Sequence, residues 1–233
     1  MVEIGKKPIL WHIMKIFASY GHTDFIVCTG YKAEFIEDYF YNFNLRSNDF
    51  TTNLGDHAQT EFHGSPQEHN WKVTVAHTGL DTPTGGRIKA IQSYVEGERF
   101  FCTYGDGIAP VDLDALLRLH ETNGGIASMT VTRPVSRFGV VDFDDNGIVS
   151  SFSEKPGGAS FVNIGYFVFE PEIFQVLSPS AVLEEDSLPA IAESGQLNAY
   201  AHDGFWQPMD TYRETLILND LWQKPSPPWK IWD

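Results

Sequence analysis

The sequence predicts an α/β protein with a mixed, mostly parallel sheet flanked by helices. Short apolar runs at 25–29, 72–77 and 100–104 have the length and composition of buried strands. Amphipathic stretches separate these runs, and this alternation is typical of βαβ units. The chain has 233 residues, 42% of them apolar, which is enough to bury the core that such a sheet needs.

Local signals place the elements of the first half. Pro8 opens a helical pattern that Gly21 ends, since proline suits the first turn of a helix and glycine its C-terminus. Asp112 is expected to cap a helix that the glycines after Asn123 stop. Two further segments have helical spacing, 31–43 and 86–95. Between 44 and 70 the chain is a polar insertion or long loop, with a weak strand near 50–53.

The second half is richer in strands. Extended patterns cover 126–132, 140–143, 148–152 and 162–169, and the run Asp144-Asp145-Asn146-Gly147 is a strong hairpin turn. Helical patterns return near 171–177, 184–194 and 211–222. The tail, residues 224–233, is rich in proline and tryptophan and is expected to pack extended on the surface. No repeat or linker is visible, so one domain over 1–233 is predicted.

Charge and composition exclude several classes of partner. Lys and Arg number 16 against 31 Asp and Glu, a net charge of −15, so neither a nucleic-acid polymer nor a membrane surface is expected as a partner. No apolar run reaches the roughly 18 residues of a membrane span, and the start shows no signal-peptide pattern. The two cysteines, Cys28 and Cys102, cannot make a disulfide framework, so a cytoplasmic location is expected.

A glycine-rich segment precedes the helix predicted at 86–95. Its residues are Thr84, Gly85, Gly86 and Arg87. Paired glycines let a backbone approach a ligand closely, and free N–H groups at a helix start attract anions. The alternative is an ordinary loop with a glycine at the start of the helix.

An acidic residue follows the strand predicted at 100–104. Asp106 lies between Gly105 and Gly107. Ligands of open parallel sheets bind beyond the carboxyl ends of the strands, and a carboxylate there can hold Mg²⁺. The alternative is a turn in which aspartate serves backbone hydrogen bonds.

Two more polar segments are candidates for a site. Glu154 and Lys155 follow the strand predicted at 148–152, where lysine suits a phosphate and glutamate suits sugar hydroxyls, although an exposed charge pair is the alternative. Asp210 precedes the last helix, where it can act as an N-cap, as a second metal carboxylate, or as both.

The remaining histidines and cysteines favour structural roles. His57, His63 and His69 lack the tight spacing of a zinc site and are expected on the surface. His12 is expected to be a packed and hydrogen-bonded histidine, and both cysteines to be buried thiols. The chain contains neither G-x-S-x-G nor G-x-x-x-x-G-K-[ST], so acyl-serine and Walker-type chemistry lack support.

Several segments, in this order, resemble the sugar-1-phosphate nucleotidyltransferase family. They are MVEIGKKPILWHIMKIF, TGGRIKA, TYGDGIA, SRFGVVDF, SEKP, VNIGYFVF and FWQPMDTYRE. Within the family the similarity is greatest to the glucose-1-phosphate cytidylyltransferases, and it runs through nearly the whole chain. Each motif alone is weak, but their joint order and spacing are specific. The resemblance implies a Rossmann-like fold with a smaller β-rich region over the sugar site.

The resemblance also implies a reaction and a set of residues. These enzymes join CTP and α-D-glucose 1-phosphate to give CDP-glucose and pyrophosphate, with Mg²⁺. They are homo-oligomers that serve nucleotide-sugar and lipopolysaccharide O-antigen biosynthesis. The implied residues are Asp106 and Asp210 for the metal, Thr84, Gly85, Gly86 and Arg87 for the nucleotide, Gly139, Glu154 and Asn163 for glucose, and Lys155 for the sugar phosphate.

One departure from the family pattern concerns the start of the chain. Family sequences begin with a strand and a G-G-x-G-T-R loop, and this sequence starts just after them. The resemblance therefore implies an N-terminally shortened chain, with an exposed strand edge beside the missing strand and with less activity than a chain that carries the loop. Two alternatives stay open: a thymidylyl- or uridylyltransferase of the same family, and a non-catalytic sugar-nucleotide binding or assembly subunit.

Overall fold

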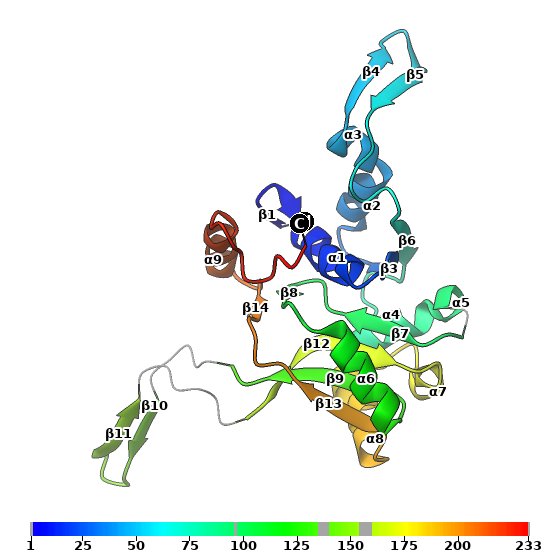
Figure 1. Cartoon of the computed structure of the whole chain (residues 1–233). Coiled ribbons are helices and arrows are strands. Elements are labelled where there is room, and N and C mark those ends of the chain that lie inside the picture. The colour runs from blue at the N-terminus through cyan, green and yellow to red at the C-terminus, as the bar shows by residue number, and fades with distance from the viewer. Residues whose placement is uncertain (1, 96, 135–139, 154–159, 233) are drawn as a thin grey trace.

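The computed structural model of the chain describes residues 2–95, 97–134, 140–153 and 160–232. Helices lie around strands that form several small sheets rather than one continuous sheet (Figure 1). The helices are α1 Ile9–Ser19, α2 Ala33–Tyr41, α3 Phe43–Ser47, α4 Thr84–Ala90, α5 Gln92–Val95, α6 Leu113–Asn123, α7 Ile173–Val176, the π-helix η1 Leu183–Ser187, α8 Leu188–Glu193 and α9 Tyr212–Trp222.

The central sheet has four strands in the order β13-β9-β12-β7. Their bounds are β7 Phe100–Thr103, β9 Ala127–Thr132, β12 Val162–Phe169 and β13 Leu197–Ala201. β9 and β13 are parallel, whereas β12 is antiparallel to both of its neighbours. The predicted α/β class with a mixed sheet is confirmed, and its antiparallel share is larger than the sequence pattern indicated.

A second, parallel pair contains β3 Asp24–Thr29 and β6 Lys72–His77. In the described part of the chain β3 pairs with β6 alone and β7 pairs with β12 alone. Each of these strands therefore has one edge without a partner strand among the described residues. The apolar side chains of β3 are only half-buried from Phe25 to Cys28, although their composition suits a covered strand.

The segment predicted as a polar insertion is a structured arm. After α3 it forms the antiparallel hairpin of β4 Asp49–Asn53 and β5 Asp56–His63, which extends away from the rest of the molecule (Figure 1). Phe50 and Phe62 face each other across the hairpin with ring centroids 6.2 Å apart. Both rings are exposed, so this hairpin buries little apolar surface of its own.

The remaining strands are short or form hairpins. Their bounds are β1 Glu3–Ile4, β2 Lys7–Pro8, β8 Gly107–Ile108, β10 Val140–Phe143, β11 Val149–Ser153 and β14 Gln207–Pro208. The turn predicted at 144–147 joins β10 to β11, and the Asp144 carboxylate accepts the N–H of Asn146 and of Ile148, at 3.0 and 2.9 Å. Pro8 precedes α1, and the Asp112 carboxylate caps α6 through the N–H of Ala115 at 2.8 Å, as predicted.

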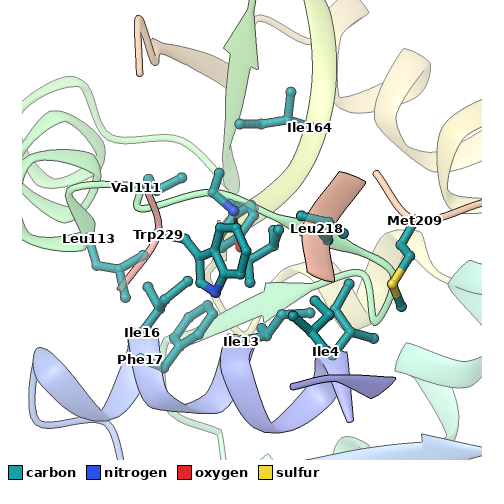
Figure 2. Close-up of a cluster of buried hydrophobic side chains, with 14 residues drawn as sticks. Ile4, Ile13, Ile16, Phe17, Val111, Leu113, Ile164, Met209, Leu218 and Trp229 are labelled. Atoms are coloured by element: carbon teal, nitrogen blue, oxygen red, sulfur yellow. Dashed lines mark hydrogen bonds between the residues drawn. The ribbon is translucent and has the colours of Figure 1, made fainter. Parts of the chain in front are cut away.

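The tail prediction was wrong for Trp229, although most of residues 224–232 are exposed as expected. Trp229 is fully buried and lies in the apolar cluster that Figure 2 shows, among Ile13, Ile16 and Leu218. Its indole N–H donates to Nδ1 of His12 at 3.4 Å, while Nε2 of His12 bonds the carbonyl of Ile4 at 2.9 Å. Burial lowers the pKa of His12 to about 4, so this histidine is neutral near pH 7. The aromatic content of the tail therefore completes the core, and His12 is the packed histidine that was predicted.

His57, His63 and His69 are exposed, as expected. Cys28 and Cys102 are free thiols within β3 and β7. Burial raises the pKa of Cys102 to about 12, so this thiol stays protonated. In the described residues, no helix combines the length and the apolarity that a bilayer crossing needs.

Candidate active site

Two carboxylates from distant parts of the sequence meet beyond the end of β7. The chain passes from β7 to Asp106 and then into β8, and β14 pairs antiparallel with β8 so that Pro208 lies opposite Gly107. The N–H of Met209 donates to the carbonyl of Asp106 at 2.8 Å. This ladder places Asp210 beside Asp106, and the two are called the carboxylate pair below.

Electrostatics inside the carboxylate pair favour a cation. Loss of water around its carboxylate raises the pKa of Asp106, and the negative charge of Asp210 raises that pKa further. The repulsion between two like charges held together in this way is relieved when a proton or a metal ion binds between them. Within the described ranges, no group of three or more His, Cys, Asp or Glu side chains is arranged to hold a metal. The carboxylate pair thus fits Mg²⁺, which commonly takes one or two protein carboxylates and completes its shell with water and substrate phosphates.

Asn163 lies on β12 near the carboxyl end of β7, where the ladder between β12 and β9 shifts register. Its Oδ1 accepts the N–H of Gly165 at 2.9 Å, and its Nδ2 donates to the hydroxyl of Tyr104 at 3.2 Å. Gly165 has a φ of +79°, and a Cβ there would lie 2.0 Å from Cδ2 of Tyr104. The glycine therefore makes room for the Tyr104 ring as well as for an unusual backbone conformation.

Thr84 reaches the same region from α4. Its hydroxyl donates to Oε2 of Glu184 at 2.7 Å and accepts the N–H of Leu183 at 2.9 Å. The hydroxyl of Tyr104 donates to the other oxygen of Glu184. Thr84, Glu184, Tyr104 and Asn163 thus form one continuous hydrogen-bond chain, and this name is kept for them below. Burial and the Glu184 carboxylate raise the pKa of Tyr104, so its phenol stays protonated.

The glycines after Thr84 have a packing role. A Cβ on Gly85 would lie 2.8 Å from the carbonyl oxygen of Ala181, and a Cβ on Gly86 would lie 2.2 Å from that of Pro179. The N–H of Gly86 donates to the carbonyl of Ala181 at 3.1 Å. The expectation of free N–H groups at this helix start is therefore wrong for Gly86. The assignment of both glycines to a nucleotide pocket stays a prediction.

The guanidinium of Arg87 is hydrogen-bonded to residues at the ends of β3 and β6. Its Nη1 donates to the carbonyl of Thr29 at 3.0 Å, to the hydroxyl of Thr78 at 2.7 Å and to the carbonyl of Gly79 at 3.0 Å. A guanidinium fork with this many acceptors fixes the loop after β6 to β3. In this structure Arg87 is thus a structural cation, and its nearness to a nucleotide stays a prediction.

The cap of the last helix is not Asp210. Thr211 is the N-cap of α9, with Glu214 at the third position closing a capping box. The N–H of Asp210 donates to Oε2 of Glu214 at 2.8 Å, so Glu214 orders the backbone of Asp210 while the aspartate carboxylate remains available for other partners. Of the predicted site residues, Gly139, Glu154 and Lys155 lie outside the described residues, and their roles stay predictions.

Sequence reasoning missed Glu184 and Tyr104 as part of this region. Glu184 lies in a run of three acidic residues, which reads as a solvated helix start. Tyr104 belongs to a segment that was singled out for its aspartate. Only the pairing of β7 with β12 and the packing of η1 against α4 bring the two side chains together.

The structure combines a mixed α/β fold with a pair of carboxylates just beyond the end of β7. The chain belongs to the nucleotidyl transferase family, which matches residues 1–211.

The chain is similar to named members of that family, in two of three cases over its whole length. It is 42% identical to "Glucose-1-phosphate cytidylyltransferase" of Salmonella typhi, covering 100% of this chain and 91% of the relative. It is 39% identical to "Probable glucose-1-phosphate cytidylyltransferase" of Bacillus subtilis, with the same coverage of 100% and 91%. It is 28% identical to "UTP--glucose-1-phosphate uridylyltransferase" of Synechocystis, over 84% of this chain and 50% of the relative.

Solved structures share the fold. HddC from Yersinia pseudotuberculosis superposes with a TM-score of 0.66 at 21% identity, covering 94% of this chain and 88% of the other. An apo UDP-glucose pyrophosphorylase superposes with a TM-score of 0.60 at 18% identity, with coverage of 94% and 88%. These likenesses agree with the predicted Rossmann-like architecture.

Proposed function

We propose that this chain transfers the cytidylyl group of CTP to α-D-glucose 1-phosphate, giving CDP-glucose and pyrophosphate. The observation that carries the proposal is the identity of 42% with a cytidylyltransferase over the whole chain. The uridylyltransferase relative is 28% identical, and the match covers 50% of that relative's length. The carboxylate pair and the hydrogen-bond chain supply polar groups suited to phosphates and sugar hydroxyls.

The reaction needs charge neutralisation more than activation of a nucleophile. An anionic oxygen of the sugar phosphate attacks the α-phosphorus of CTP, a new P–O bond forms, and the bond to pyrophosphate breaks. The nucleophile is already ionised near neutral pH, so no serine-type triad is required. Two polyanions must instead be brought together, and at an effective dielectric constant of about 20 two unit charges ~4 Å apart interact by roughly 4 kcal/mol.

The carboxylate pair would hold a Mg²⁺ ion. Bound there, the ion would offset the negative charge of the phosphates during transfer. The protein's own contribution is to hold Asp106 and Asp210 together through the β8–β14 ladder, and the pKa of Asp106 is raised first by loss of solvation and further by the charge of Asp210. Since the chain carries a net charge of −15, local neutralisation of the ligands is a first-order requirement.

The other assignments follow the resemblance. Thr84, Gly85, Gly86 and Arg87 would line or flank the nucleotide, and Gly139, Glu154 and Asn163 would face the glucose. Lys155 would meet the sugar phosphate, since a lysine ammonium is a mobile point charge suited to that group.

A nucleotide comparison tests the proposal. The purified protein is assayed for pyrophosphate release from CTP, UTP and dTTP, each with glucose 1-phosphate and Mg²⁺. We expect turnover with CTP to exceed that with either competitor by at least roughly ten-fold, which corresponds to about 1.4 kcal/mol of discrimination. Chelation of the metal by EDTA should abolish turnover, and added Mg²⁺ should restore it.

Two results would overturn the proposal. Faster turnover of UTP or dTTP would assign the chain to another nucleotide within the same chemistry. Binding of CDP-glucose in calorimetry, without turnover of any of the three nucleotides, would favour a non-catalytic binding subunit.

A further inference from the structure

Glu184 lies between two groups of residues that the resemblance assigns to different substrates. Thr84, on the nucleotide side, donates to its Oε2 at 2.7 Å. Tyr104 donates to its Oε1 and accepts from Asn163, on the sugar side, at 3.2 Å. We propose that Glu184 is a positioning residue that orients Thr84 toward the nucleotide and, through Tyr104, orients Asn163 toward the sugar. This inference rests on the proposed function.

The direction of every bond in the hydrogen-bond chain is determined. A hydroxyl has one hydrogen, and those of Thr84 and Tyr104 are both given to Glu184. Each hydroxyl then accepts one N–H, from Leu183 and from Asn163 respectively. Glu184 is an acceptor on both of its carboxylate oxygens. A glutamine at this place would lack one of the two acceptors.

The same bonds decide what Asn163 offers to a ligand. Its Oδ1 accepts the N–H of Gly165 at 2.9 Å, which fixes the orientation of the amide. Nδ2 has two hydrogens, and one is given to Tyr104. The second is left to point at an acceptor, so the structure favours a sugar hydroxyl oxygen or a phosphate oxygen as its partner. Glu184 favours this arrangement because it takes the hydrogen of the Tyr104 hydroxyl, which leaves the oxygen of that hydroxyl facing Asn163 as an acceptor.

The backbone around Glu184 supports a special role for this segment. η1 is a π-helix that runs directly into α8. Such turns are rare, and they occur frequently at functional sites. The segment is held firmly, since the N–H of Val182 donates to the Asp186 carboxylate at 2.7 Å and Leu183 is 1% exposed. Glu184 therefore projects from a rigid support rather than from a loose loop.

The test separates the two branches by their Michaelis constants. Glu184→Gln should raise KM for both CTP and glucose 1-phosphate by roughly ten-fold, the size expected for a hydrogen bond to a charged group. Tyr104→Phe removes only the hydroxyl that links Glu184 to Asn163, so it should raise KM for glucose 1-phosphate and leave KM for CTP within two-fold. Thr84→Val should show the opposite pattern. Equal effects of Tyr104→Phe on both substrates would overturn the inference.

Glu170→Gln is the matched control. Glu170 is also a half-buried glutamate with two donors, Arg99 Nε at 2.7 Å and His120 Nε2 at 3.1 Å, and it lies outside the candidate site. This variant should change neither Michaelis constant. If Glu170→Gln and Glu184→Gln raised both constants equally, a general loss of stability would explain them, and the positioning role would be wrong.

A second readout does not depend on catalysis. A double-mutant cycle of thermal unfolding with Glu184→Gln and Tyr104→Phe should show a coupling energy, because the two side chains bond each other. If the wild-type protein neither turned over nor bound CTP, the proposed function would fail while this coupling remained. If the wild type were active but the coupling and the KM split were both absent, the inference about Glu184 would fail alone.

Discussion

The carboxylate pair and the hydrogen-bond chain lie at the same end of β7, but their polar groups differ in whether they have partners within the protein. In the first, Asp106 and Asp210 oppose each other with like charges, and the pKa of Asp106 rises. In the second, each hydroxyl hydrogen of Thr84 and Tyr104 meets a carboxylate oxygen of Glu184. The negative charge of the carboxylate pair thus needs a cation to offset it, whereas the hydrogen-bond chain is already ordered before any ligand binds.

This difference indicates a division of labour. A repulsive pair gains most from an ion that arrives with the substrate phosphates, so under the proposed function the carboxylate pair would bind a metal ion when the phosphates are present. A satisfied hydrogen-bond chain keeps its side chains in place at no further entropic cost on binding. The predictions below test the two sides separately.

The largest effect is expected from Asp106→Ala. Removal of one carboxylate weakens metal binding, and charge stabilisation by a metal is worth several kcal/mol, so turnover should fall by at least about a hundred-fold. Asp220→Ala removes an exposed aspartate from α9, whose partner Lys224 lies 3.6 Å away, and serves as the control. Pyrophosphate release measures both variants. Activity of Asp106→Ala within a few-fold of the parent would remove the metal role of the carboxylate pair.

A smaller effect, on stability, is expected from Gly165→Ala. The new Cβ would lie 2.0 Å from Cδ2 of Tyr104 at a φ of +79°, so the ring must move and the hydrogen-bond chain must break. We expect a loss of about 3 kcal/mol from backbone strain and overpacking together. Gly195→Ala is the matched control, because Gly195 has a φ of +71° and nothing within 4 Å of the added atom. Equal losses in urea unfolding would show that Tyr104 is not held as described.

The smallest effect is expected from Asp210→Asn and concerns the protonation of Asp106. Asp210→Asn removes a like charge beside Asp106, so the pKa of Asp106 should fall toward its ordinary value. A raised pKa in the folded state means that the native carboxyl binds protons more tightly. Stability is therefore gained as pH falls through that pKa, and the variant should lose the part of this gain that comes from repulsion while the part that comes from loss of solvation remains. A carboxyl ¹³C NMR titration measures the pKa of Asp106 in the parent and in the variant. An unchanged pKa would show that the two carboxylates do not interact.

Much of the fold was predictable from local signals. The strand predicted at 72–77 matches β6, and those at 25–29 and 100–104 match β3 and β7 within one residue. Asp112 caps α6 as predicted, because an N-cap depends on neighbours in the sequence. The hairpin of β4 and β5 was not predicted as such because its sequence is polar, and β13 was not predicted because its five residues are too few to show a strong alternation.

The expected meeting of Asp106 and Asp210 is found in the structure, whereas the contacts of other candidate site residues differ from those expected, and the roles of all of them stay predictions. The glycines at Gly85 and Gly86 were expected to admit a ligand, and the structure shows instead that they admit the backbone at Pro179 and Ala181. Arg87 was expected near a nucleotide and is bound to carbonyls of β3 and of the loop after β6. In both cases the residue type is suited to two uses, and only the contacts made across the fold decide between them.

The sequence by itself determined the α/β class, the strongly acidic surface and the family, because composition, periodicity and motif order are properties of the chain alone. The tertiary structure decided that Asp210 lies beside Asp106, that Trp229 completes the core around His12, and that Glu184 joins Thr84 to Tyr104. The physical reason is distance along the chain. Each of these contacts joins residues about eighty or more positions apart, and no local propensity specifies which distant partner a side chain will meet.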